Sequence, residues 1–140
     1  MNARLFDEVH ELALDIVEAS SDHDKKSEWA AYTVLRELCE YNERTEHNHP
    51  FQWETLGDFT ANNSKAVSIY QKALDLAEDI DEIEYIASIK LALAERYFEA
   101  EDCERAYQLA FQANDVAKKT DDLELRQEIS ELLLELVSKA

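Results

Sequence analysis

A pattern of small and aromatic residues occurs twice in this chain, and all equivalent positions lie 40 residues apart. The matched pairs are Ala66/Ala106, Tyr70/Ala110, Ala73/Ala113 and Ala77/Ala117. At the same offset, residues 83–97 match residues 123–137 through Ile83/Leu123, Ile89/Ile129, Leu93/Leu133 and Tyr97/Val137. A fixed period of roughly 20–50 residues is typical of stacked helix pairs, because one pair cannot bury its apolar face alone. The sequence therefore predicts an all-α protein of stacked helical hairpins.

Apolar side chains at helical spacing predict about seven amphipathic helices. We expect helices over about residues 3–19, 27–43, 82–100 and 103–118, a third that starts at Pro50, a fourth after Ser64 and a seventh from Asp121. These starts rest on residues that suit helix N-termini: Ser27, Ser64 and Asp102 as N-caps, Pro50 in a first turn, and Asp121 with Glu124 as a capping-box-like pair.

The chain of 140 residues has the length of one domain. Within it we expect a degenerate or capping helix pair over residues 1–48, repeats over 50–79 and 82–118, and a C-terminal capping helix over 121–138. The chain has one glycine and one proline. This composition argues against a β-rich fold and against glycine-rich phosphate loops, so we expect no nucleotide or other cofactor.

Several segments resemble the tetratricopeptide repeat family. The stretch from Trp53 to Gly57 looks like the W-x2-L-G opening of a first helix, and residues 65–74 look like a second helix. The next repeat offers Leu93, Ala94, Tyr97, Ala106, Ala110 and Ala113. The resemblance covers about residues 50–120 and implies antiparallel helix pairs stacked as a short right-handed superhelix. The period exceeds the family's roughly 34 residues, and a generic helical bundle is the alternative.

In this family the first helix of each pair lines a concave groove that holds the ligand. Carried over by resemblance, the groove positions here are Glu54, Asp58, Leu91, Glu95, Phe98, Glu99, Glu131 and Glu135. Relatives that grip acidic chaperone tails carry cations at such places, whereas this chain carries carboxylates. A basic or mixed basic and apolar ligand is therefore expected, with Leu91 and Phe98 offering apolar contacts. A merely solvated acidic face is the alternative.

The chain is strongly acidic, with 32 Asp and Glu against 14 Lys and Arg and a net charge of −18. Such a charge repels nucleic acid and anionic membranes, so neither is expected as a direct ligand. It favours a basic protein partner. Residues 78–104 hold ten of the carboxylates against Lys90 and Arg96.

The sequence offers no convincing catalytic or metal-binding motif. His47 and His49, like His23 between two aspartates, fall in predicted loops rather than on one helix face. No nucleophile elbow is present, because its glycines are missing. We expect Trp29 and Trp53 in the core. Cys39 and Cys103 are expected to be buried and reduced, which, with no signal peptide or membrane span, favours the cytoplasm.

The leading hypothesis is a non-enzymatic module that binds a basic protein. The alternative is an immunity or antitoxin-type inhibitor that covers a basic toxin nuclease, because an acidic surface can occupy a nucleic-acid site. A helical hydrolase that uses His47 and His49 ranks last. An exposed apolar face on the first or seventh helix would also allow a homodimer.

Overall fold

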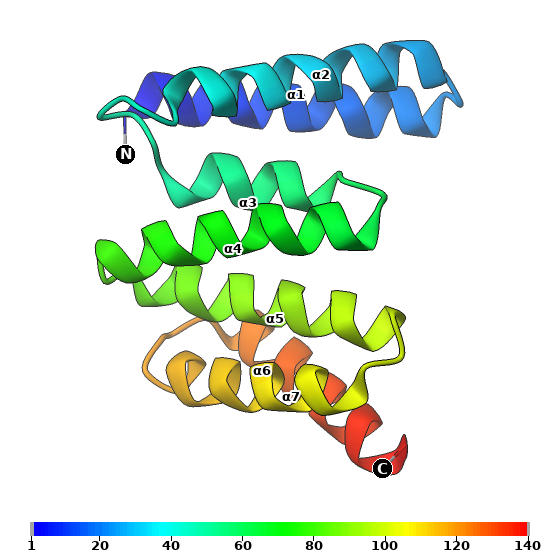
Figure 1. Ribbon diagram of the computed structural model, residues 1–140, viewed down its shortest axis with the longest axis vertical. Coiled ribbons are helices and arrows are strands. Elements are labelled where there is room, and N and C mark those ends of the chain that lie inside the picture. Colours follow the sequence, from blue (N-terminus) through cyan, green and yellow to red (C-terminus); the bar gives the residue numbers. More distant parts are fainter. Residues whose placement is uncertain (1, 140) are drawn as a thin grey trace.

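The computed structural model describes residues 2–139, which form seven α-helices and no strand. The all-α prediction is confirmed. Figure 1 shows the helices stacked in chain order, with sequential neighbours antiparallel. Their bounds are α1 Ala3–Ser21, α2 Lys25–Asn42, α3 Pro50–Asp58, α4 Asn63–Asp79, α5 Ile83–Glu99, α6 Cys103–Ala117 and α7 Leu123–Lys139.

Short polar side chains start most of the helices, although not always the ones expected. Asp102 accepts the predicted bond from the backbone N–H of Arg105, and Pro50 begins α3. The N-cap predictions at Ser27 and Ser64 are wrong, because Asp24 and Asn62 cap these helices three and two residues earlier. Likewise the carboxylate that accepts from the Leu125 N–H belongs to Asp122, not to Asp121. Several adjacent Asp, Asn and Ser residues compete for each cap, and sequence alone does not rank them.

Three of the helix links share one backbone conformation. His23, Asp81 and Glu101 each have positive φ, at 56°, 53° and 65°, directly before the next helix. In each link the following residue donates its N–H across the end of the preceding helix, for instance Asp102 to the carbonyl of Tyr97 at 2.9 Å. This is the Schellman arrangement, in which glycine is the preferred left-handed residue. The chain therefore makes these turns with residues that tolerate the conformation less well.

The 40-residue offset is reproduced by the helices. α4 and α6 begin at residues 63 and 103, and α5 and α7 begin at 83 and 123. The matched small and aromatic residues are all buried: Ala66, Tyr70, Ala73, Ala77, Ala106, Ala110, Ala113 and Ala117. Small side chains at these positions allow the neighbouring helices to approach closely.

Gly57 also allows a close approach between helices. A Cβ on Gly57 would stand 2.6 Å from the ring of Tyr70, which is itself only 3% exposed. The Tyr70 hydroxyl donates to Asp58 at 2.6 Å, and the Arg96 guanidinium donates to the Gly57 carbonyl at 3.1 Å. The packing of Tyr70 on Gly57 and these two hydrogen bonds together join α3, α4 and α5. They also fix the side of the stack on which Asp58 lies.

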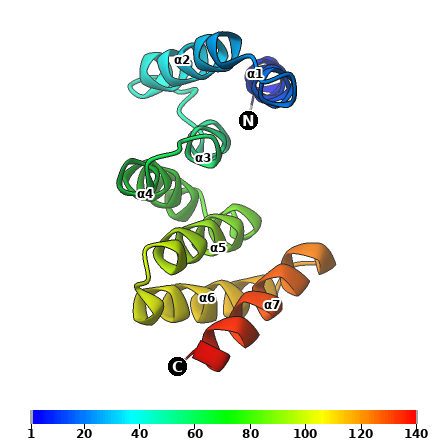
Figure 2. The ribbon, with the colours of Figure 1, turned by 90° about the vertical axis from the view of Figure 1, so that its right-hand side faces the viewer.

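The core consists of two clusters that meet along α5. The larger is built from α1 to α5 around Leu35, Leu56 and Ile89, and the smaller from α5 to α7 around Ala110 and Ile129. The first helices of the pairs contact one another in series, α1 with α3, α3 with α5 and α5 with α7. Figure 2 shows α2 beside α1 and α4 beside α3, with α2 and α4 both displaced towards the same side of the stack.

One tryptophan prediction is confirmed and the other is wrong. Trp53 is 3% exposed, but Trp29 is 61% exposed. Among residues 2–139, α2 packs against α1 and α3 and its backbone does not approach α4, so the side of α2 that carries Trp29 is left open. Cys39 is buried and Cys103 half-buried, and both thiols are free. Burial raises the pKa of the Cys39 thiol to about 12, which keeps it protonated and unreactive.

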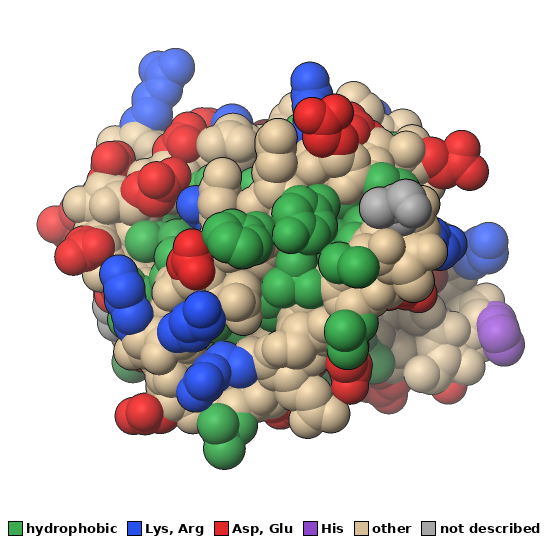
Figure 3. Space-filling model, turned by 90° about the horizontal axis from the view of Figure 1, so that it is seen from below, with side chains coloured by type: hydrophobic (Ala, Val, Ile, Leu, Met, Phe, Trp, Pro, Cys, Tyr) green, Lys and Arg blue, Asp and Glu red, His purple; other side chains and the backbone are tan. Residues whose placement is uncertain are grey.

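Apolar side chains remain exposed at both ends of the stack. Phe6, Leu14 and Val17 are exposed on α1, and Leu134 and Val137 on α7. Figure 3 looks at the C-terminal end and shows hydrophobic side chains gathered near the middle of that face. The predicted apolar faces therefore exist, while self-association stays a prediction. Within residues 2–139, no helix has the length and apolar character needed to cross a membrane.

Candidate functional site

Two adjoining hollows follow one side of the stack, where α3, α5 and α7 succeed one another. They measure about 360 Å³ and 620 Å³, and they share Glu95, Glu99 and Glu128. Together they are lined by all eight residues predicted for the groove: Glu54, Asp58, Leu91, Glu95, Phe98, Glu99, Glu131 and Glu135. We call the two hollows together the acidic groove.

Helical spacing explains why these side chains share a surface. Glu95 and Glu99 lie four residues apart on α5, and Glu131 and Glu135 lie four apart on α7, so each pair projects from one helix face. Because α5 contacts both α3 and α7, the three acidic faces adjoin. The result is a row of carboxylates that crosses three helices.

The acidic groove holds its carboxylates under mutual repulsion. Desolvation raises the pKa of Glu54 to about 7, opposed by a hydrogen bond from the Ser88 hydroxyl and reinforced by the charge of Asp58. Desolvation also raises the pKa of Glu95, with further increases from the charges of Glu128, Glu99 and Asp58. A cation placed among these groups would favour their charged forms.

Asp58 is an exposed residue whose carboxylate is nevertheless crowded by its neighbours. Desolvation of the carboxylate by these neighbours raises the pKa of Asp58, while the hydrogen bond from Tyr70 and the charge of Arg96 act in the opposite direction. Arg96 is the one basic residue lining the groove in the described part of the chain. It donates to the Gly57 carbonyl and to Asn63 across the helix stack. These structural bonds hold the Arg96 guanidinium against α3 and α4.

The apolar positions of the groove differ from the sequence-based expectation. Leu91 is only 4% exposed, because it packs into the smaller core cluster beneath the groove. Its predicted role as an open apolar contact is therefore wrong. Phe98 is half-buried, and the ammonium of Lys139 lies 5.0 Å from the centre of its ring. Phe98 thus remains the accessible apolar residue of the pair.

Sequence reasoning missed Glu128 and Ser88. Glu128 lines both hollows, and its position one helical turn before Glu131 is a signal that would have revealed it. Ser88 bonds Glu54 across the interface of α5 with α3, and no pattern within either helix predicts that pairing.

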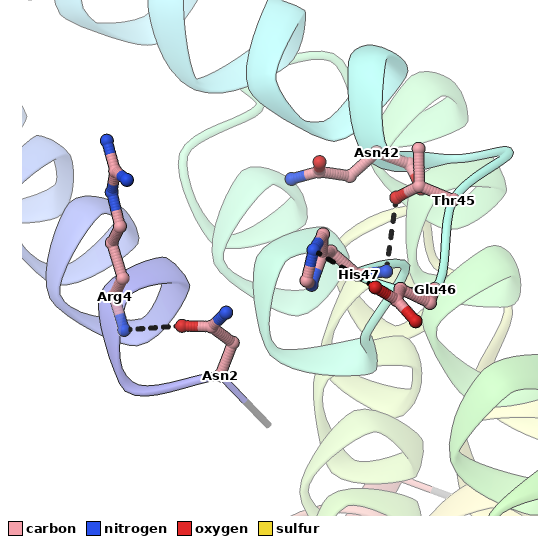
Figure 4. Close-up of polar contacts among 6 residues, drawn as sticks. All are labelled: Asn2, Arg4, Asn42, Thr45, Glu46 and His47. Carbon is pink, nitrogen blue, oxygen red and sulfur yellow. Dashed lines mark hydrogen bonds and ion pairs between the residues drawn. The ribbon is translucent and has the colours of Figure 1, made fainter.

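The histidines do not assemble a metal site. Within residues 2–139, no group of three or more His, Cys, Asp or Glu side chains is placed to hold a metal ion. His47 lies 3.8 Å from the carboxylate of Glu46 in the loop after α2, with Asn2 and Arg4 at the start of α1 opposite (Figure 4). The ring of His49 accepts a bond from the Phe51 N–H and so caps α3.

Comparison of the chain with family models, with curated proteins and with solved structures finds no match.

Proposed function

We propose that this chain is a non-catalytic interaction module and that its acidic groove binds a basic segment of a protein partner. One observation carries the proposal: seven carboxylates line a continuous groove in which Arg96, bound to α3 and α4, is the one lining cation among the described residues. Charge complementarity of this kind steers association and selects the partner.

The crowded carboxylates also favour a cationic ligand energetically. At neutral pH part of the Glu54 population is protonated, because its pKa lies at about 7. A lysine or arginine side chain in the groove would lower that pKa and release the proton. The ligand therefore stabilises the charged form of a carboxylate that desolvation disfavours, and Phe98 gives an apolar contact beside it.

A stack of the tetratricopeptide type is the arrangement that we propose for the whole chain. It is supported by the 40-residue offset of α4 with α6 and of α5 with α7, and by the serial contacts of α1, α3, α5 and α7. In such a stack the first helices line the ligand groove, which is the side where the acidic residues lie. A reducing compartment, such as the cytoplasm, suits the buried free thiol of Cys39.

The test is a binding measurement on a charge-reversed groove. Basic peptides are first selected by the wild-type protein from a displayed random library, and their affinities are then measured by calorimetry. Glu95→Lys combined with Glu99→Lys should weaken binding by about tenfold or more while leaving helical content intact. Asp7→Lys with Glu11→Lys, an exposed pair with the same spacing on α1, is the matched control. Unchanged affinity in the groove variant would refute the proposal.

An inhibitor of a basic nuclease is the second candidate. The net charge of −18 and the length of the acidic groove favour it, because such a surface can occupy a site made for nucleic acid. A neighbouring gene that encodes a toxin with a basic C-terminal domain, and survival of cells that co-express both proteins, would support this role. Continued killing in that co-expression experiment would count against it.

A further inference from the structure

A second hollow lies away from the acidic groove, between α2 and α4. It measures about 810 Å³, and its apolar lining includes Ile16, Phe59 and Ile69. The backbones of α2 and α4 do not approach each other closely, and both helices run in the same direction across the stack (Figure 1). A hollow of this size is in the range that holds a ligand or a short peptide segment. We call it the α2–α4 hollow.

The charge of the α2–α4 hollow is opposite to that of the protein. Lys25, Arg36, Lys65 and Lys72 line it against the single carboxylate of Glu28. The whole chain, by contrast, carries 14 basic and 32 acidic residues. The hollow thus gathers four of the 14 basic residues beside one carboxylate, in a chain where acidic residues outnumber basic ones.

Two of the four cations have no carboxylate partner. The Arg36 side chain lies 3.8 Å from the carboxylate of Glu40, and the Lys72 ammonium lies 2.8 Å from that of Glu43. Both carboxylates are near the C-terminal end of α2. Lys25 and Lys65, by contrast, form no ion pair with any residue between 2 and 139. They therefore remain available to an anionic ligand.

An exposed tryptophan stands at the wall of the hollow. Trp29 is 61% exposed and stacks on Tyr32, with ring centres 5.6 Å apart and the Arg36 guanidinium 6.0 Å from the Trp29 ring. The Tyr32 hydroxyl bonds Thr60 at 2.8 Å, which links α2 to the segment before α4 and fixes the wall. Tryptophan and arginine are among the residues enriched at the binding hot spots of protein interfaces.

The lysines occupy positions that helix stability disfavours. Lys25 is the first residue of α2, and Lys65 lies in the first turn of α4, where the helix dipole favours anions. A chain so rich in carboxylates nevertheless places cations at both N-termini, and both line the same hollow. Local stability therefore does not explain them, whereas an acidic ligand does.

We propose that the α2–α4 hollow is the docking site for an acidic segment of a second protein partner. The segment presents an aromatic or aliphatic side chain to Trp29 and carboxylates to Lys25 and Lys65. This site stands on its own residues and does not depend on the acidic groove. With both sites occupied, the protein bridges a basic partner and an acidic one.

The first test is a selection that isolates this site. Peptides from a displayed random library are selected on the wild-type protein and depleted on the Lys25→Glu, Lys65→Glu double variant. We expect the surviving peptides to be rich in Asp and Glu and to carry an aromatic or aliphatic residue. Survival of basic peptides, or of none, would overturn the proposal. The variant should fold, because both substitutions place carboxylates in first helical turns.

The second test is the affinity of a surviving acidic peptide, measured by tryptophan fluorescence. Trp29 is exposed and Trp53 is buried, so binding should shift the emission of wild type but not of Trp29→Phe. Lys25→Glu with Lys65→Glu should weaken binding by about tenfold or more. Lys26→Glu with Lys119→Glu, which changes the charge equally at exposed sites outside the hollow, should not. Equal weakening in both variants would overturn the proposal.

Two further outcomes identify the occupant and separate the two sites. Sedimentation measures whether the wild-type protein forms a dimer. A dimer that is lost in the Lys25→Glu, Lys65→Glu variant, and that the acidic peptide does not displace, would overturn the partner proposal. The occupant of the hollow would then be a second copy of the chain. Glu95→Lys with Glu99→Lys should leave acidic-peptide binding in place. Its loss there would assign the peptide to the acidic groove and contradict a separate site.

Discussion

At the scale of single residues, Gly57 shows how a helix glycine can be required by packing rather than by backbone conformation. It lies inside α3, where alanine would ordinarily favour the helix by about 1 kcal/mol. The ring of Tyr70 occupies the space that a Cβ needs, at 2.6 Å. Glycine therefore stabilises the contact of α3 with α4 at the expense of local helix preference.

We predict that Gly57→Ala lowers the free energy of unfolding by about 1–3 kcal/mol, because Tyr70 must shift and strain its bond to Asp58. Urea unfolding followed by circular dichroism measures this change. An unchanged or higher midpoint would contradict the packing account, since helix preference alone predicts a gain.

Glu54 links the charge of the groove to stability. Its folded pKa of about 7 lies above the usual value of 4.5, so its ionisation costs stability as pH rises through that interval. We predict that Glu54→Gln stabilises the protein at pH 8 by up to about 3 kcal/mol and by much less at pH 5. Gln keeps an oxygen to accept from Ser88. Thermal unfolding at the two pH values measures the difference, and an equal gain at both would contradict the raised pKa.

At the scale of helices, apolar spacing predicted the number and approximate bounds of the elements. It did not predict which residues contact each other across helices. The apolar residues of α2 lie on two different faces of the helix, because Leu35 is buried whereas Trp29 and Val34 are exposed. Spacing marks an apolar face without telling which neighbour covers it. The groove residues were predicted from the resemblance to tetratricopeptide repeats, and the 40-residue offset served only to place Glu131 and Glu135 opposite Leu91 and Glu95 in the repeat. Leu91 was misjudged because its burial depends on α6 and α7.

The links between helices offer a matched test of backbone strain. Glu101 has a φ of 65°, so we predict that Glu101→Gly raises stability by about 1 kcal/mol. Glu104→Gly, inside the first turn of α6, should lower it by a similar amount. Chemical unfolding of the two variants checks the contrast. A loss of stability in both would show that the left-handed conformation at Glu101 carries no strain.

At the scale of the whole molecule, charge is divided between two sides of one helical stack. Carboxylates gather where α3, α5 and α7 adjoin, and cations gather between α2 and α4. The net charge of −18 adds a long-range field that attracts basic partners, and salt weakens that attraction. We therefore expect the charge of the ligand, more than any apolar contact, to be the basis of recognition.

The most direct measurement is the affinity of a selected basic peptide for the protein at pH 6 and pH 8. Because Glu54 ionises at about pH 7, the account predicts binding up to about tenfold tighter at pH 8. That dependence should disappear in Glu54→Gln. Equal affinity at the two pH values, or the same dependence in Glu54→Gln, would contradict a basic ligand in the acidic groove.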